Sequence, residues 1–148
     1  MPLALRRSNN LTVSAWYRAT SGGRDEIVSG GDQYVLRLIP NQIEFSKRIS
    51  GGSYVQCLAT VSGHFDGNWH HVAGVTSTAG MKVYFDGVET CSNGAGDSIV
   101  NDLGPDLFVG RHGFNQIGWD FDGNIDDVRI YGRALPASEI SYLAKGNR

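Results

Sequence analysis

The chain has 148 residues, with 13 Lys and Arg against 15 Asp and Glu, a formal net charge of -2 and a pI near 6.0. Because its basic residues are scattered, the chain lacks the positive surface that nucleic acids and anionic membranes require, and no nucleic-acid partner is expected. No apolar stretch approaches the roughly 20 residues that span a bilayer, so membrane insertion is not expected either. Residues 1–10 are too short for a secretory signal, and a chain of this length suits a single domain.

Short runs of Val, Ile, Thr and aromatic residues alternate with Gly, Asn and Asp clusters, which is typical of an antiparallel β protein. The predicted strands cover, in chain order, residues 11–19, 26–29, 33–39, 42–47, 53–61, 69–77, 81–86, 88–92, 106–111 and 123–131. Pro40–Asn41 and Asp86–Gly87 fit tight turns between strands. Residues 136–144 have helical periodicity. The pattern predicts a two-sheet β-sandwich with one short C-terminal helix.

Five motifs carry a family resemblance: LTVSAW (11–16), WHHVAGV (69–75), KVYFDGV (82–88), LFVGR (107–111) and FDGNIDDVRIYGRALPASEI (121–140). In this order and spacing they resemble the laminin-G-like, concanavalin A-like lectin/glucanase superfamily, which includes the pentraxins. The resemblance implies an all-β fold, an antiparallel two-sheet jelly-roll β-sandwich. Residues 1–10 would form a short N-terminal segment, and residues 11–148 a single domain of this kind.

The resemblance also implies a function. It predicts a non-catalytic carbohydrate-binding or adhesion module, often stabilised by calcium, whose partner is a glycan or a cell-surface protein. Such modules are often appended to larger secreted or cell-surface proteins, so the resemblance suggests a secreted or cell-surface location, while the sequence itself leaves the location open. The alternative is a structural protein–protein interaction domain that binds no glycan.

Two adjacent aspartates stand in the last predicted strand, 123–131. Strand alternation places Asp126 with Val128 and Ile130 on the more apolar face, and it places Asp127 beside Arg129 on the other. A carboxylate at the edge of a core requires a cation or several hydrogen-bond donors. Asp126 also resembles the aspartate that supports a structural calcium in laminarinase-like β-glucanases, so we expect it to bind calcium with loop carbonyls around residues 21–26. The alternative is that Asp126 accepts backbone N–H groups from a neighbouring loop.

The loop of residues 111–123 is the first candidate for ligand binding, because loops of a rigid sandwich often carry recognition residues. Its aromatic and polar side chains are Phe114, Asn115, Gln116, Trp119 and Asp120. Aromatic faces suit the C–H face of a sugar, and amides and carboxylates suit its hydroxyls. The alternative is that Trp119 folds back and covers the end of the sandwich. A second candidate surface is the sheet that carries Tyr34, Arg37 and Glu44.

The sequence does not favour an enzyme. A glycanase requires paired carboxylates about 5–10 Å apart, and in the glucanase relatives these come from one strand as Glu-x-Asp-x-x-Glu or a close variant. Neither DEIVSGG (25–31) nor QIEFSKR (42–48) repeats acids at that alternation, and the sequence contains no G-x-S-x-G, phosphate-loop or H-E-x-x-H motif. A glycan-active hydrolase is therefore the less favoured reading.

Cys57 and Cys91 are the two cysteines, and the sequence leaves open whether they pair. A bridge between them would stabilise the fold by roughly 3–4 kcal/mol in the chain-entropy model. An oxidising location favours the disulfide, and a reducing one favours two free thiols.

The N-terminus suggests self-association. Relatives of this fold usually have a further strand before the segment 11–16, and here residues 1–10 stand in that place. In those relatives the further strand normally helps to cover the C-terminal strand, which here is 123–131. We therefore expect strand 123–131 to present unpaired backbone groups, which would support a homodimer through this sheet edge or a swap of the N-terminal segment. The alternative is a monomer whose edge is blunted by the charges of Asp126, Asp127 and Arg129 or covered by the C-terminal helix.

Overall fold

The computed structural model describes residues 9–100, 106–113 and 117–146. Within them the elements are, in chain order, β1 (Leu11–Arg18), β2 (Asp25–Gly30), β3 (Tyr34–Ile39), β4 (Gln42–Arg48), the 3-10 turn η2 (Ser50–Gly52), β5 (Tyr54–Thr60), β6 (His70–Ser77), β7 (Gly80–Phe85), β8 (Val88–Asn93), β9 (Leu107–Val109), β10 (Asn124–Tyr131) and α1 (Ala137–Leu143). Each predicted strand is present, and the predicted C-terminal helix is confirmed.

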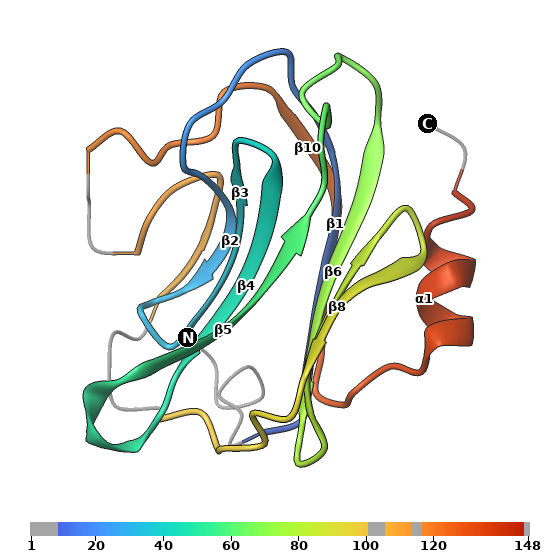
Figure 1. Cartoon of the computed structure of the whole chain (residues 1–148). Coiled ribbons are helices and arrows are strands. Elements are labelled where there is room, and N and C mark those ends of the chain that lie inside the picture. Colours follow the sequence, from blue (N-terminus) through green and yellow to red (C-terminus); the bar gives the residue numbers. More distant parts are fainter. Residues whose placement is uncertain (1–8, 101–105, 114–116, 147–148) are drawn as a thin grey trace.

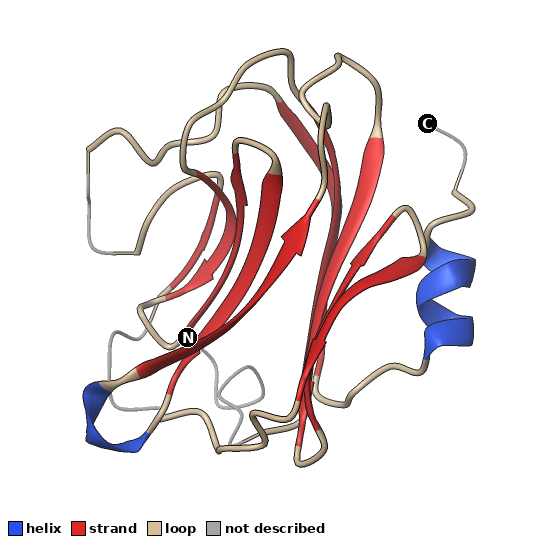
Figure 2. Ribbon diagram, viewed as in Figure 1, coloured by secondary structure: helices blue, strands red, loops and turns tan. Residues whose placement is uncertain are grey.

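The strands form two antiparallel sheets. Sheet A has the order β10-β1-β6-β7-β8, and sheet B has the order β5-β4-β3-β2-β9. Figures 1 and 2 show the sheets as two curved layers, with α1 outside the layer that contains β6 and β8. Positive φ angles at Asn41 (62°), Asp86 (47°) and Gly87 (81°) confirm the two predicted tight turns. The architecture is an antiparallel jelly-roll β-sandwich.

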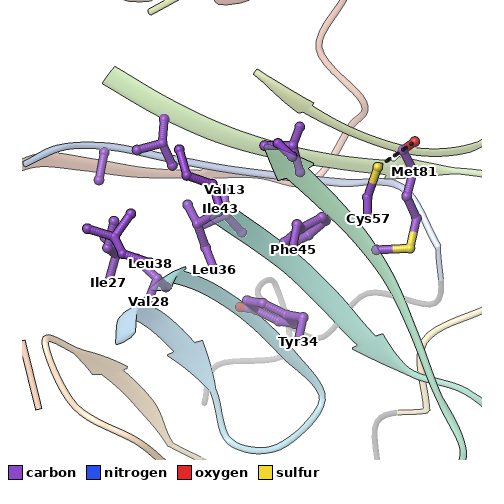
Figure 3. Close-up of a cluster of buried hydrophobic side chains, with 14 of the residues drawn as sticks. Val13, Ile27, Val28, Tyr34, Leu36, Leu38, Ile43, Phe45, Cys57 and Met81 are labelled. Carbon is purple, nitrogen blue, oxygen red and sulfur yellow. Dashed lines mark hydrogen bonds between the residues drawn. The ribbon is translucent and has the colours of Figure 1, made fainter. Parts of the chain in front are cut away.

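The hydrophobic core fills the space between the two sheets. Alternation explains its composition, since Leu36 and Leu38 of β3 face inward opposite Phe45 and Ile43 of β4, while Arg37 between them faces outward. Figure 3 shows side chains of both sheets meeting in this layer; those labelled are Val13, Ile27, Val28, Tyr34, Leu36, Leu38, Ile43, Phe45, Cys57 and Met81. Burial of this apolar surface is the main stabilising contribution to the fold.

A second, smaller apolar cluster lies on the outer face of sheet A. It joins Ala73 and Val75 of β6 and Tyr84 of β7 to Leu135 and Ile140 of the C-terminal segment. Ile140 is the buried residue of α1, so the helix docks by this side chain. Within the described part of the chain, no helix is both long enough and apolar enough to cross a membrane.

A disulfide and a buried lysine tie the two sheets together. Cys57 of β5 and Cys91 of β8 form the disulfide, which links an edge of sheet B to an edge of sheet A. Lys47 of β4 is fully buried, and its Nζ donates hydrogen bonds to Thr76 Oγ1 on β6 (2.9 Å) and to the carbonyl oxygens of Ala95 (2.9 Å) and Asp97 (2.5 Å). Burial lowers the pKa of the Lys47 ammonium. The ammonium is thus satisfied by oxygens that hold the segment after β8 against both sheets.

Candidate functional site

The outer face of sheet B carries a row of buried charges. In the strand register Glu26 of β2 lies opposite Arg37 of β3, and Arg37 lies opposite Glu44 of β4. The guanidinium of Arg37 lies 3.5 Å from Glu26 Oε1 and 3.8 Å from Glu44 Oε2. The Glu26 side chain is fully buried, and those of Arg37 and Glu44 are nearly so. One cation between two carboxylates offsets much of the cost of burying them.

A histidine from a distant segment completes this row. His112 follows β9 and is buried, and its Nδ1 lies 2.7 Å from Glu26 Oε1. Burial raises the pKa of the Glu26 carboxyl above its ordinary value, although the neighbouring Arg37 and His112 act against that rise. The contact places His112 on the outer face of sheet B.

Trp119 lies against the same row of charges. Its carbonyl accepts a hydrogen bond from the Glu26 N–H (3.0 Å), and its ring contacts the His112 ring with centroids 4.7 Å apart. The guanidinium carbon of Arg37 lies 5.0 Å from the Trp119 ring centroid, and that of Arg24 lies 5.1 Å away. These are cation–π distances. The indole is thus held in place while part of its surface remains accessible.

The opposite wall is formed by Tyr54 at the start of β5, which is 50% exposed. Its hydroxyl donates a hydrogen bond to the Asp32 carboxylate. Between the two aromatic walls is a cavity of about 350 Å³, which we call the sheet B groove; it is lined by Asp32, Arg37, Glu44, Ser46, Tyr54, Gln56, His112 and Trp119. Two aromatic walls above a floor of hydroxyl, amide, carboxylate and guanidinium groups can stack a sugar and hydrogen-bond its hydroxyls.

The groove unites residues from both predicted ligand surfaces. Trp119 of the predicted loop lines it, together with Arg37 and Glu44 of the predicted sheet surface, whereas Tyr34 points into the core. Trp119 folds back over the outer face of sheet B and also lines this cavity, and its role in ligand binding stays a prediction. Asp120 is exposed. The predicted ligand residues Phe114, Asn115 and Gln116 lie outside the described residues.

Sequence reasoning missed the remaining side chains of the groove. Tyr54 and Gln56 alternate on β5 and pair with Arg48 and Ser46 on β4, so hairpin register was the signal that could have found them. His112 gave no such signal, because its partner Glu26 lies 86 residues away in the sequence.

The predicted orientation of Asp126 is wrong. Ile125, Val128 and Ile130 pack against the core, and Asp126 is exposed on the outer face of sheet A, opposite Trp16 of β1. The cause is a β-bulge at this point of the β1–β10 ladder, with Asp127 at a φ of 49°. A bulge inserts one residue and reverses the alternation beyond it.

The premise for calcium at Asp126 therefore fails. Its Oδ1 accepts the N–H of Asp127 (2.7 Å), and Asp127 Oδ1 accepts a hydrogen bond from Arg129 Nε (2.9 Å), as expected for that pair. Among the described residues, no three His, Cys, Asp or Glu side chains gather in a way that could hold a metal ion. Any calcium at Asp126 would rely on backbone carbonyls, and calcium binding stays a prediction.

Solved structures share this fold over almost the whole chain. Domain 4 of AbnA, an extracellular arabinanase of Geobacillus stearothermophilus solved with arabinotriose, is 23% identical with a TM-score of 0.69, over 98% of this chain and 71% of that one. The SAP-like pentraxin of Limulus polyphemus is 16% identical with a TM-score of 0.68, over 95% and 72% of the two chains. The binding domain of botulinum neurotoxin serotype G is 17% identical with a TM-score of 0.71, over 97% of this chain.

The chain spans 38% of the length of that neurotoxin domain. No curated protein sequence matches the chain. The family model described as the concanavalin A-like lectin/glucanases superfamily matches residues 2–141, which confirms the predicted resemblance. This chain therefore belongs to the concanavalin A-like lectin/glucanases superfamily.

Proposed function

We propose that this chain is a non-catalytic carbohydrate-binding or adhesion module that holds its glycan in the sheet B groove. The observation that carries the proposal is the cation–π contact between the Trp119 ring and the guanidinium of Arg37. That guanidinium is itself held by Glu26 and Glu44. A fixed aromatic face beside fixed charged groups suits a ring with hydroxyls at its rim. The fold shared with the arabinanase domain in complex with arabinotriose supports the same reading.

The position of Arg37 argues against hydrolysis. A glycosidase needs two carboxyl groups that face each other across the scissile bond. Here the guanidinium of Arg37 contacts both Glu26 and Glu44, so it takes the place that a glycosidic bond would need between them. We propose no catalytic residue, and we expect no reducing ends to be released from any glycan that the domain binds. Release that depends on Glu44 would contradict this.

A glycan array tests the proposal, read with the native protein and two tryptophan variants. Trp119→Ala removes an aromatic wall of the groove and should lower binding by about tenfold or more, as loss of a central aromatic anchor does in other interfaces. Trp69→Ala is the matched control. Trp69 is also partly buried and also lies beneath a guanidinium, that of Arg18 at 5.2 Å, but it does not line the groove.

The comparison of the two variants decides the site. Binding that is lost in Trp119→Ala and retained in Trp69→Ala supports the groove. Equal loss in both variants would indicate damage to the fold instead of loss of a contact. A native protein that binds nothing on the array, with or without calcium, would remove the proposed function.

A second candidate function is association with protein through a sheet edge. Within the described residues β10 is the outermost strand of sheet A, as expected, and it can template pairing with another chain. Such pairing would give a homodimer or a contact with a cell-surface protein. The bulge at Asp127 acts against it, because bulges twist an edge away from a partner.

Light scattering coupled to size exclusion tests the homodimer. A dimer that persists on dilution and dissociates in a Val128→Pro variant of β10 supports edge pairing, since proline cannot donate to a ladder. A monomer of 16.0 kDa at every concentration excludes it. The predicted swap involves the N-terminal segment 1–10, of which residues 1–8 lie outside the described residues.

A further inference from the structure

We infer that the sheet B groove selects a neutral oligosaccharide of two or more sugar units over a single sugar and over a carboxylated oligosaccharide. The inference rests on the proposed function, because it concerns the ligand of the same groove. Two features carry it: the spacing of the two aromatic walls and the balance of fixed charges along the floor.

The spacing of the walls sets the ligand length. Tyr54 stands on β5, whereas Trp119 lies over Arg37 of β3, and β4 runs between these two strands. Two strand spacings amount to about 10 Å. The two positions are also offset along the strands, because Tyr54 pairs with Arg48, whereas Arg37 pairs with Glu44 and Glu44 pairs with Leu58. The backbone positions that carry the two walls are therefore further apart than one sugar ring is wide, and a ligand of two or more units that runs diagonally across the strands contacts both walls and the floor between them.

The floor is richer in acceptors than in cations. The groove is lined by the carboxylates of Asp32 and Glu44 and by the guanidinium of Arg37. The positive charge of Arg37 is already offset by Glu44 and by Glu26 behind it. Arg24 contacts Trp119 from outside the groove lining. His112 also lines the groove and is held by Glu26, and Arg48 acts on Tyr54 from outside the lining. Among the described residues that line the groove, carboxylates therefore outnumber guanidinium groups.

This balance separates two classes of glycan. Sugar hydroxyls donate hydrogen bonds, and an ionised carboxylate accepts them more strongly than a neutral oxygen does. A carboxylate on the sugar instead meets Asp32 and Glu44 as like charges in a partly desolvated site, which disfavours binding. Arg37 gives that carboxylate little compensation, because its own charge is shared between two glutamates.

The test uses oligosaccharides of one to four hexose units from glucans and galactans, each beside its C6-oxidised uronic acid counterpart of the same linkage. Calorimetry at low and at high salt measures the dissociation constants. We expect neutral affinity to rise from one unit to two or three, and we expect the uronic acids to bind weaker by on the order of tenfold, less so at high salt. Uronic acids that bind as tightly as the neutral sugars, or a monosaccharide that binds as tightly as a trisaccharide, would overturn the inference.

Two variants connect the preference to the groove. Glu44→Gln removes a lining charge and keeps the shape of the side chain, so the preference for the neutral sugar should shrink several-fold. Asp32→Asn does the same at a half-buried position, which serves if the buried Glu44 variant fails to fold. An unchanged preference in a folded variant overturns the charge argument. If the native protein binds none of the neutral or acidic sugars, the proposed function itself is overturned. If it binds both classes equally, only the inference about selectivity is overturned.

Discussion

The outer faces of the two sheets follow the same strand alternation but carry opposite chemistry. On sheet A the outward positions include Ala73, Val75 and Tyr84, and they are covered by Leu135 and Ile140 of the C-terminal segment. Thr12 on the same face holds that segment, since its Oγ1 donates to the Arg133 carbonyl (2.8 Å) and accepts the Leu135 N–H (2.9 Å). This face extends the apolar core.

On sheet B the outward positions carry Glu26, Arg37 and Glu44, and these are covered by His112 and Trp119. On this face the buried charges need polar partners and are not covered by a packed apolar layer. The aromatic side chains of Trp119 and Tyr54 instead line a groove above them. The proposed function therefore places recognition and stability on opposite faces of one sandwich. Substitutions should be able to change one property and leave the other intact.

The largest expected effect is on sheet A. Ile140→Ala empties a fully buried position between α1 and the sheet, and should lower the free energy of unfolding by about 2–5 kcal/mol. Tyr142→Ala on the same helix is the control, because Tyr142 is 78% exposed, and it should cost within about 0.5 kcal/mol. Urea denaturation measures both. Equal costs would mean that the helix contributes no buried packing.

Acid should weaken the sheet A side through His71, which is buried against Trp16. Burial lowers its pKa from 6.5 to about 4 in the folded state. Below about pH 6.5 the His71 side chain of the unfolded chain binds a proton, whereas that of the folded chain stays neutral until about pH 4. The free energy of unfolding therefore falls as the pH drops through that window. The loss attributable to His71 reaches roughly 3 kcal/mol.

A comparison of native protein and His71→Gln by urea denaturation at pH 7 and pH 4.5 isolates this effect. The variant should show a smaller loss between the two pH values. His64 is also buried with a lowered pKa, so a residual acid effect in the variant is expected from it. An identical loss in the two proteins would show that His71 does not titrate in this range.

Calcium is a third way to test what stabilises the sheet A side. If the prediction of calcium binding at Asp126 is right despite its outward orientation, the ion should stabilise the native state by mass action, by about 2.7 kcal/mol at a hundredfold excess over its dissociation constant. The melting temperature should then rise with calcium and fall with a chelator, and Asp126→Asn should remove the difference. Superimposed melts of the native protein in excess calcium and in excess chelator would end the proposal.

The fold was predictable because each of its signals is local. Strand alternation, the Asp86–Gly87 turn and the helical period around Ile140 each depend on neighbouring residues, and each was confirmed. The same logic failed at Asp126, because alternation holds only until a residue is inserted. The bulge at Asp127 inserts a single residue, and no feature of the sequence GNIDDVRIY predicted it.

The site was predictable only in parts. Trp119 could be chosen as a surface aromatic in a loop, and Arg37 and Glu44 could be chosen by their alternation on a sheet. That these residues share one cavity depends on the contact of His112 with Glu26 and on the backbone bond from Glu26 to Trp119. Both connect segments far apart in the sequence, where no periodicity reaches. The sequence likewise could not decide whether Cys57 and Cys91 pair, because the two residues lie on different sheets and their contact depends on how the sheets pack.

A small effect on stability, in contrast with that of Ile140, is expected at Tyr54 on the sheet B side. Half of its surface is exposed, so Tyr54→Ala should change the free energy of unfolding by no more than about 0.5–1 kcal/mol. Its ring nevertheless forms one wall of the groove, so the same substitution should weaken binding of oligosaccharides while leaving that of single sugars less affected. Tyr54→Phe keeps the ring and removes the hydroxyl bonded to Asp32, so it should bind nearly as the native protein does if stacking is the contribution that matters. Glycan titration and urea denaturation of the same three proteins check both statements together. A Tyr54→Ala variant that is as destabilised as Ile140→Ala, or that binds like the native protein, would remove the separation of stability and recognition between the two faces.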